Sequence, residues 1–327
     1  MADLAEQLTV VLLTHDCAPW LPHTLDRLAE LGLPVVAVDN ASRDGTRELL
    51  AERPFVQLRA LATNTGAAGR NEGVRAALTP YVAFCDDDGW WERSGLERAV
   101  QLLDAHPRLA LVNARIVVGE ECAPDPISAE MADSPLPETE GVPGAVLYSF
   151  MGGASVLRVS AYEQVGGYHP AFFIGGEEET LAWPLLTSGW LMRYVDDVVM
   201  HHHPSQANFA RIRHFGIRNT LWNAWLHRPW RSALRYTGFI LRSSPHDAEL
   251  ARGLGLTVRG LPWVLRRRDP VGPEVDAGLR LLEERRFAAW DAARLAGLPP
   301  GTAPKYPVPV LAADPGAHPA AVPTGAG

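Results

Sequence analysis

An apolar run that stops at three consecutive carboxylates constrains this chain more than any other stretch. Residues 81–85 are Tyr-Val-Ala-Phe-Cys, and Asp86, Asp87 and Asp88 follow them directly. The run predicts a buried strand, and acids at its end repel one another unless water, N–H groups or a cation offset their charge. Side chains alternate along an extended backbone, so we expect Asp86 and Asp88 on one face and Asp87 on the other. The cluster predicts either a divalent-cation site or a solvated turn before a helix.

Three earlier apolar runs are also short and rich in branched residues, at 8–14, 34–39 and 56–61. Apolar spacing and cap residues predict helices between them, at 20–31, 46–52 and from 64–73 onward. The alternation predicts a doubly wound α/β fold, a mostly parallel sheet flanked by helices. Polar clusters at Asp39, at Asn64 to Asn71 and at the three aspartates would then share the carboxyl edge of the sheet, where such folds bind ligands.

The pattern after residue 91 predicts a helix, a strand, a long surface loop over the site, a second helix and a last strand, at 94–105, 109–118, 120–144, 177–188 and 191–200. Gly152 and Gly153 precede the second helix. They allow either a close approach of backbone to a ligand or a bulge. Three histidines, His201, His202 and His203, follow the last strand.

Charge is distributed unevenly along the 327 residues. The net charge of −8 argues against a nucleic-acid partner, but residues 205–270 hold twelve Arg and three acids, a balance of +9. The same segment contains Trp222, Trp225, Trp230 and Trp263. Basic helices edged with Trp suit the surface of an anionic membrane. The alternative is that these residues pack inside a helical subdomain or an oligomer contact.

Cysteine usage and hydropathy indicate the compartment. The three cysteines form no C-x-x-C pair, the first residues lack a basic signal region, and no apolar run approaches the roughly 18 residues of a spanning helix. We expect a cytoplasmic protein whose membrane contact, at the inner face, would be peripheral. Composition divides it into an α/β domain at 1–204, a basic, Trp-rich helical extension at 205–298 and a disordered Pro/Ala/Gly tail at 299–327.

Two common nucleotide-binding motifs are missing. The turn after the first strand has no G-x-G-x-x-G, which argues against a dinucleotide-binding Rossmann protein, and there is no Walker A sequence. Residues 8–205 instead resemble family 2 glycosyltransferases of the GT-A fold. The resemblance rests on Thr14 and on segments that follow in family order, at 38–46, 64–73, 84–88, 175–179 and 201–203.

The resemblance implies a metal-dependent, inverting glycosyltransferase that uses Mn²⁺ or Mg²⁺. It would move a sugar from a UDP- or dTDP-sugar to a hydroxyl acceptor, which could be a glycan, a lipid-linked glycan or a natural product. Asp88 is assigned to the metal, and Asp86 lies near the ribose and the metal. Asp39 matches the acid that hydrogen-bonds the base, although it could instead cap the next helix. The remaining donor-site residues are Arg70, near the phosphates, with Thr14, Asn64 and Asp87.

Inversion requires a base that deprotonates the acceptor hydroxyl. Family register places it at Glu178, with Thr180 where a second acid is usual, so Glu177 and Glu179 stay alternative bases. Adjacent acids raise one another's pKa when they are buried, which suits a general base.

The same register favours His202 as a metal ligand, while strand alternation turns His201 and His203 to the opposite face. A solvated histidine run without a ligand role is the alternative. For the whole protein, the alternative to catalysis is a GT-A-like domain that binds a nucleotide-sugar or glycan without turnover and partners another transferase.

Overall fold

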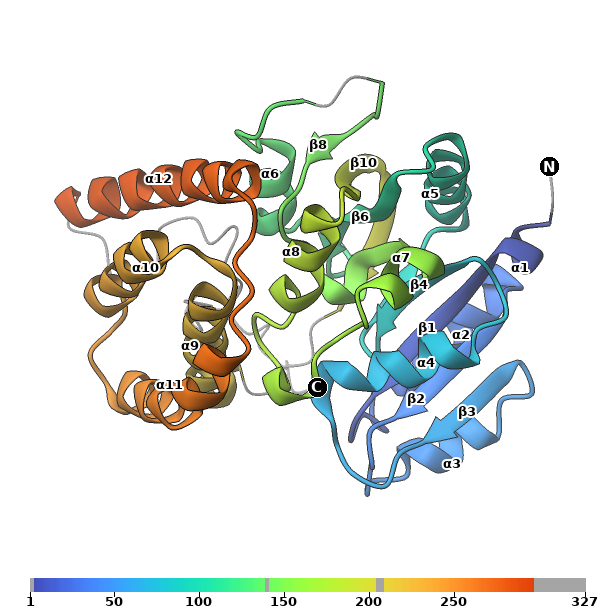
Figure 1. The fold of residues 1–327 in the computed structure, drawn as a ribbon. Coiled ribbons are helices and arrows are strands. Elements are labelled where there is room, and N and C mark those ends of the chain that lie inside the picture. Colours follow the sequence, from blue (N-terminus) through green and yellow to red (C-terminus); the bar gives the residue numbers. More distant parts are fainter. Residues whose placement is uncertain (1–2, 139–140, 204–208, 297–327) are drawn as a thin grey trace, which may run out of the picture.

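A mixed sheet lies at the centre of the protein (Figure 1), whose computed structural model describes residues 3–138, 141–203 and 209–296. The strands follow the order β3-β2-β1-β4-β9-β6-β10-β5, with β7 added to β6 and β8 to β10. The first four of this order are mutually parallel, as predicted, whereas β9 is antiparallel to β4 and β6. The strands are β1 (Leu8–Thr14), β2 (Val35–Asp39), β3 (Val56–Ala60), β4 (Tyr81–Asp86), β5 (Gly89–Trp91), β6 (Leu109–Val118), β7 (Ala123–Pro124), β8 (Ala145–Val146), β9 (Ser155–Arg158) and β10 (Leu191–His202).

Helices cover the sheet, and a further group of helices stands beside it (Figure 1). Those of the sheet domain are α1 (Leu4–Gln7), α2 (Leu21–Leu31), α3 (Thr46–Ala51), α4 (Arg70–Ala76), α5 (Arg93–Ala105), α6 (Pro126–Ala132), α7 (Val159–Gln164) and α8 (Glu179–Thr187), with short 3₁₀ turns η1 (Gly66–Gly69), η2 (Gly152–Ala154) and η3 (Pro170–Phe172). The adjacent group is α9 (Phe209–His227), α10 (Trp230–Ser243), α11 (Ala248–Arg266) and α12 (Pro273–Leu295).

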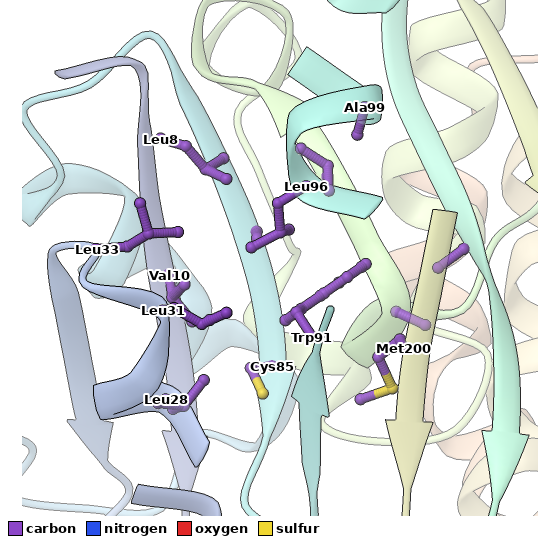
Figure 2. Close-up of a cluster of buried hydrophobic side chains, with 14 of the residues drawn as sticks. Leu8, Val10, Leu28, Leu31, Leu33, Cys85, Trp91, Leu96, Ala99 and Met200 are labelled. Atoms are coloured by element: carbon purple, nitrogen blue, oxygen red, sulfur yellow. The ribbon is translucent and has the colours of Figure 1, made fainter. Parts of the chain in front are cut away.

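The two faces of the sheet carry separate apolar clusters. Alternate residues of β1 point to opposite faces, so Val10 belongs to one cluster and Val11 to the other. Figure 2 shows the first cluster, in which Leu28 of α2 and Leu96 of α5 gather with strand residues such as Cys85. Because both faces are apolar, only the strand ends can present polar chemistry.

The predicted surface loop at 120–144 is wrong in part, because α6 forms inside it. Asp125 caps this helix by accepting from the Ile127 N–H at 2.9 Å, and Pro126 occupies its first position. Met131 of α6 is buried. Strand β5 is also absent from the predicted elements; it forms because its Trp91 is buried and donates Nε1–H to the Phe84 carbonyl at 3.0 Å.

The helical extension packs against the sheet domain through α9, α12 and α11, and in α11 the Trp263 ring lies 5.2 Å from the His169 ring. Both α9 and α12 contact α8, and α9 also contacts α10 and α11. Leu282 of α12 packs with Leu136 and Val146 of the sheet domain. No helix in the part of the chain that the structure describes is both long and apolar enough to cross a membrane. The predicted tail at 299–327 lies outside the described residues.

The arginines and tryptophans of residues 205–270 divide between interior and surface. Arg218, Arg228 and Trp222 are buried, so the packing alternative holds for them. The side chains that remain exposed include Trp230 and three arginines of α11, Arg252, Arg259 and Arg266.

Candidate active site

Parallel register carries the polar strand ends to one edge of the sheet, as the sequence pattern predicts. Thr14 at the end of β1 pairs with Asp39 at the end of β2, and its neighbour Leu13 pairs with Asp86 at the end of β4. The Thr14 hydroxyl is buried and donates to the Val38 carbonyl at 3.3 Å. Thr14 therefore uses its hydroxyl within the sheet, at the position where we expected it to contact the nucleotide-sugar.

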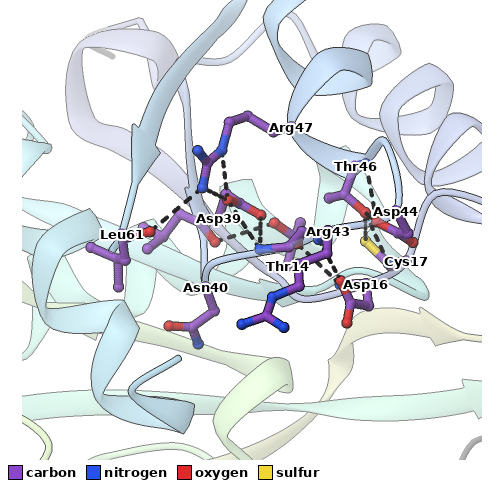
Figure 3. A network of polar contacts seen from close by, with 12 residues as sticks. Thr14, Asp16, Cys17, Asp39, Asn40, Arg43, Asp44, Thr46, Arg47 and Leu61 are labelled. Atoms are coloured by element: carbon purple, nitrogen blue, oxygen red, sulfur yellow. Dashed lines mark hydrogen bonds and ion pairs between the residues drawn. The ribbon is translucent and has the colours of Figure 1, made fainter. Parts of the chain in front are cut away.

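Asp39 is buried at this edge, and its carboxylate already has partners (Figure 3). It accepts from the Ser42 N–H at 3.2 Å and from Arg47 Nε and Nη2 at 3.0 and 2.7 Å. The Ser42 bond closes the turn after β2 and does not cap the next helix, because the N-cap residue of α3 is Gly45, so the capping alternative is wrong. Nothing in the sequence pointed to Arg47. A carboxylate has about four acceptor positions, so the pyrimidine base of a nucleotide could hydrogen-bond Asp39 alongside these protein donors.

Asn64 shapes the turn that leads into α4. Its Oδ1 accepts from the Gly66 N–H at 2.8 Å, and Gly66 has a φ of +62°. A Cβ on Gly66 would lie 2.1 Å from the carbonyl oxygen of Phe173, so only glycine allows this close packing. The turn places Arg70 at the start of α4.

Arg70 is buried and forms an ion pair with Asp86. Its guanidinium also lies 5.6 Å from the Phe84 ring centroid and 5.7 Å from that of Tyr168. Burial alone would lower the pKa of Arg70, but nearby negative charge, above all that of Asp86, raises it. Arg70 is therefore a fixed cation at the edge, with a geometry that suits phosphate oxygens.

Asp87 does not join Asp86 and Asp88. Its carboxylate accepts from Trp20 Nε1 at 3.1 Å, on the side of α2, in the opposite orientation that alternation predicts. Burial, reinforced by the charges of Asp88 and Asp86, raises the pKa of Asp87 to about 7. Its role in donor binding stays a prediction, and its observed partner is the Trp20 indole.

Asp88 lies beside His202, the imidazole that the sequence favoured. Asp88 Oδ1 and His202 Nε2 are 3.5 Å apart. Burial disfavours a charge on His202, but its hydrogen bond to Asp88 and the nearby carboxylates raise its pKa. Within the described ranges, no three His, Cys, Asp or Glu side chains are arranged to hold a metal ion. One carboxylate and one imidazole do fit an ion whose other ligands are waters and substrate phosphate oxygens.

His201 and His203 face away from this pair. His201 Nε2 lies 3.1 Å from Glu92 Oε1, and its ring stacks on Trp90 with 5.2 Å between centroids. The His203 ring is 4.6 Å from the Trp90 ring. Both histidines line an open pocket of about 520 Å³ with His23 of α2.

Three adjacent glutamates, Glu177, Glu178 and Glu179, are buried where α8 begins. Each has one carboxylate oxygen without a hydrogen-bond partner among the described residues. Burial is the largest cause of a raised pKa in all three, and it raises the pKa of Glu179 to about 8. The pKa of Glu178 is raised despite the opposing charge of Arg70.

The glutamates point to different surroundings. Glu179 accepts from the Ser149 hydroxyl at 3.0 Å and lines a cavity of about 20 Å³ that Thr220 and Arg228 also line. Glu178 instead lies against Gly152 and influences Asp86 and Arg70 through its charge. Glu177 and Glu178 both interact with the charge of Arg70, and Asp86 is among the largest influences on the pKa of Glu178.

Gly152 and Gly153 connect Glu178 to the strand end. A Cβ on Gly152 would lie 3.4 Å from Glu178 Oε1 and 3.6 Å from the Arg70 guanidinium carbon, and a Cβ on Gly153 only 2.2 Å from Asp86 Oδ2. The group that this backbone approaches closely is the Asp86 carboxylate, and close approach to a ligand stays a prediction. Tyr168, whose buried hydroxyl would lie 3.1 Å from the Gly152 Cβ, was not found from the sequence, which gives it no motif.

Comparison with known proteins agrees with this geometry. Residues 9–166 match the model of glycosyl transferase family 2. The chain is similar to a pre-mycofactocin glycosyltransferase of Mycobacterium tuberculosis, with 33% identity over 145 residues. That match covers 43% of this chain and 30% of the relative, so it spans less than a third of the relative's length.

Two solved structures share the fold. Mannosyltransferase PcManGT from Pyrobaculum calidifontis, in complex with GDP-Man and Mn²⁺, aligns with a TM-score of 0.51 and 20% identity, covering 89% of this chain and 79% of that one. S. aureus TarS 1-349 aligns with a TM-score of 0.57 and 15% identity, covering 89% and 92%. The family match shows that residues 9–166 form a glycosyl transferase family 2 domain, and the mixed sheet with the two similar structures shows that the chain has a GT-A fold.

Proposed function

We propose that this protein is a metal-dependent, inverting glycosyltransferase that uses a UDP- or dTDP-sugar and a hydroxyl acceptor. The observation that carries the proposal is the meeting of three groups at one sheet edge: the Arg70–Asp86 ion pair, the Asp88–His202 pair and the buried Glu178. Family membership supplies the reaction class. A glycan or a lipid-linked glycan is the acceptor that we propose.

The cationic side of the site would handle the leaving diphosphate. Arg70, held in place by Asp86, would donate to a phosphate oxygen, and Asp88 with His202 would hold Mn²⁺ or Mg²⁺. A divalent cation bound there would offset the charge that grows on the diphosphate as the anomeric C–O bond breaks. The Mn²⁺ complex of PcManGT supports this choice of metal.

Glu178 would act as the base. Burial raises the pKa of Glu178, which makes its carboxylate a stronger acceptor for the proton of the acceptor hydroxyl. Its Oε2 has no hydrogen-bond partner among the described residues and is available for that proton. Glu179 is a weaker candidate because it already accepts from Ser149.

The test is release of nucleoside diphosphate from a panel of UDP-, dTDP- and GDP-sugars in the presence of Mn²⁺. Glu178→Gln should lower turnover by roughly 10²–10⁴-fold, the usual contribution of a general base, while the donor still raises the melting temperature. Asp88→Asn should lose both turnover and the effect of Mn²⁺ on it. Glu163→Gln makes the same chemical change on the exposed surface of α7 and should leave turnover unchanged.

Turnover that survives in both Glu178→Gln and Asp88→Asn would contradict the proposal. Donor binding to the wild-type protein without turnover of any donor, with or without a glycan acceptor, would favour the non-catalytic alternative. The cytoplasmic location stays a prediction.

A further inference from the structure

Helix α11 has an outer face that the proposed reaction does not use. Its inner residues, such as Gly253 and Val264, are buried, and a Cβ on Gly253 would lie 2.9 Å from Ile217 of α9. The opposite face exposes small and apolar residues at alternating intervals of four and three, which places them in one line along the helix. We call this line the α11 stripe: Ala251, Gly255, Val258, Pro262 and Leu265.

A row of arginines runs beside the α11 stripe. Arg252, Arg259 and Arg266 recur every seven residues, and all three are exposed. None of them forms an ion pair with any residue that the structure describes. The two acids between residues 230 and 266, Asp247 and Glu249, are paired with Arg213 and His214 of α9. The outer face of α11 therefore combines apolar surface with a net positive charge, because Glu249, whose charge also acts on Arg252, is the one acid of this helix.

The apolar surface is substantial along the C-terminal half of the helix. Val258 is 68% exposed and Leu265 is 40% exposed. Trp230, at the start of α10, is 53% exposed, and its ring centroid lies 4.0 Å from the guanidinium carbon of Arg268, which follows α11. An exposed Trp thus lies near the end of the stripe that carries Leu265.

We propose that the α11 stripe, its arginine row and Trp230 bind the surface of an anionic membrane, with α11 lying in the plane of the interface. Apolar side chains would enter the boundary between headgroups and acyl chains while arginines bind lipid phosphates. A second copy of the chain is a poorer occupant, because an antiparallel two-fold contact of two stripes would bring the two arginine rows together, and a parallel one would leave both rows without an acidic partner. Nucleic acid would leave Val258 and Leu265 without apolar partners. The inference does not rest on the proposed reaction.

The test is co-flotation of the full chain with vesicles of phosphatidylcholine alone or with roughly one third phosphatidylglycerol. We expect binding to the anionic vesicles only, weakened by high salt. Replacing the row by Arg252→Gln, Arg259→Gln and Arg266→Gln should lower the affinity roughly 100-fold, since each surface arginine contributes about fivefold. Val258→Asn with Leu265→Asn keeps the charge and should also weaken binding.

The matched control is Arg75→Gln, Arg98→Gln and Arg108→Gln, which removes the same charge from the sheet domain and should leave vesicle binding near wild type. Donor turnover and melting temperature, measured for every variant, separate loss of the surface from loss of the fold or of catalysis. Equal losses in the row and control variants would overturn the proposal. Equal binding to neutral and anionic vesicles would also overturn it. A third contrary outcome is a wild-type protein that does not bind vesicles but sediments as a dimer, with the dimer lost in the row variant.

Discussion

Buried acids occur in two regions of this protein, and their surroundings differ. In the helical extension, Asp276 accepts from Arg228 Nε at 2.7 Å, and Glu283 accepts from Arg235 at 2.6 Å and also pairs with Arg228. At the start of α8, the glutamates 177–179 form no ion pair with a described cation. Burying a charge is costly unless it is paired. The paired acids therefore hold helices together, whereas the unpaired acids retain a strong affinity for protons, which a base requires.

The largest expected effect comes from breaking the paired set. Arg228→Met leaves two buried carboxylates short of a cation and should lower the free energy of unfolding by about 3–5 kcal/mol. Urea denaturation measures this. Arg294→Met removes an exposed arginine whose Nε lies 3.9 Å from Asp291 and should cost no more than about 1 kcal/mol. Similar losses in both variants would show that burial and pairing do not give the acids around Arg228 their structural role.

The unpaired glutamates 177–179 should make the stability of the protein depend on pH. Between the ordinary pKa of 4.5 and about 8, folded Glu179 keeps a proton that the unfolded chain releases, so the stability of the wild type falls as pH rises through this range. Glu179→Gln cannot ionise and should gain stability relative to wild type, on the order of 1–3 kcal/mol, at the upper end of the range but not at the lower. Thermal melts across the range measure this; a pH-independent difference would contradict it.

A smaller effect, on the KM for the sugar donor, is expected from a substitution at Gly153, whose backbone approaches Asp86. Gly153→Ala places a Cβ 2.2 Å from Asp86 Oδ2 and must displace the carboxylate that holds Arg70. We expect KM for the donor to rise about tenfold, or ~1.4 kcal/mol, with little change in melting temperature. Gly238→Ala in α10 meets no atom within 4 Å and is the control; an unchanged KM in Gly153→Ala would show that the glycine is not needed there.

The smallest effect is expected at an exposed pair. Arg98 Nε lies 3.0 Å from Asp197 Oδ2, and both side chains are open to solvent. Asp197→Asn should change the free energy of unfolding by less than about 1 kcal/mol, since water and salt screen such pairs. Denaturation in low and high salt checks this. A larger change would mean that exposure does not separate the weak pairs from the strong ones.

Local sequence patterns predict the strand ends and their orientations correctly. Alternation is sufficient to separate Asp87 from Asp88 and His202 from His201, because both depend only on neighbouring residues. The choice of His202 over the other two histidines came from the family resemblance. The partners of these side chains could not be predicted: Trp20 reaches Asp87 across 67 positions in the chain. Arg228 likewise meets Asp276 across 48 positions. Such pairings depend on how whole elements pack, which periodicity does not record.

The packing of α12 against the sheet domain affects how the protein unfolds. Leu282 packs with Leu136 and Val146, and Arg285, also in α12, forms an ion pair with Asp133 of the sheet domain. Helix α12 therefore stabilises the sheet domain, which contains the candidate active site. Heating should melt both halves in a single step, and a shortened chain that ends at His203 would lose the cover over Val146 and precipitate rather than serve as a minimal enzyme.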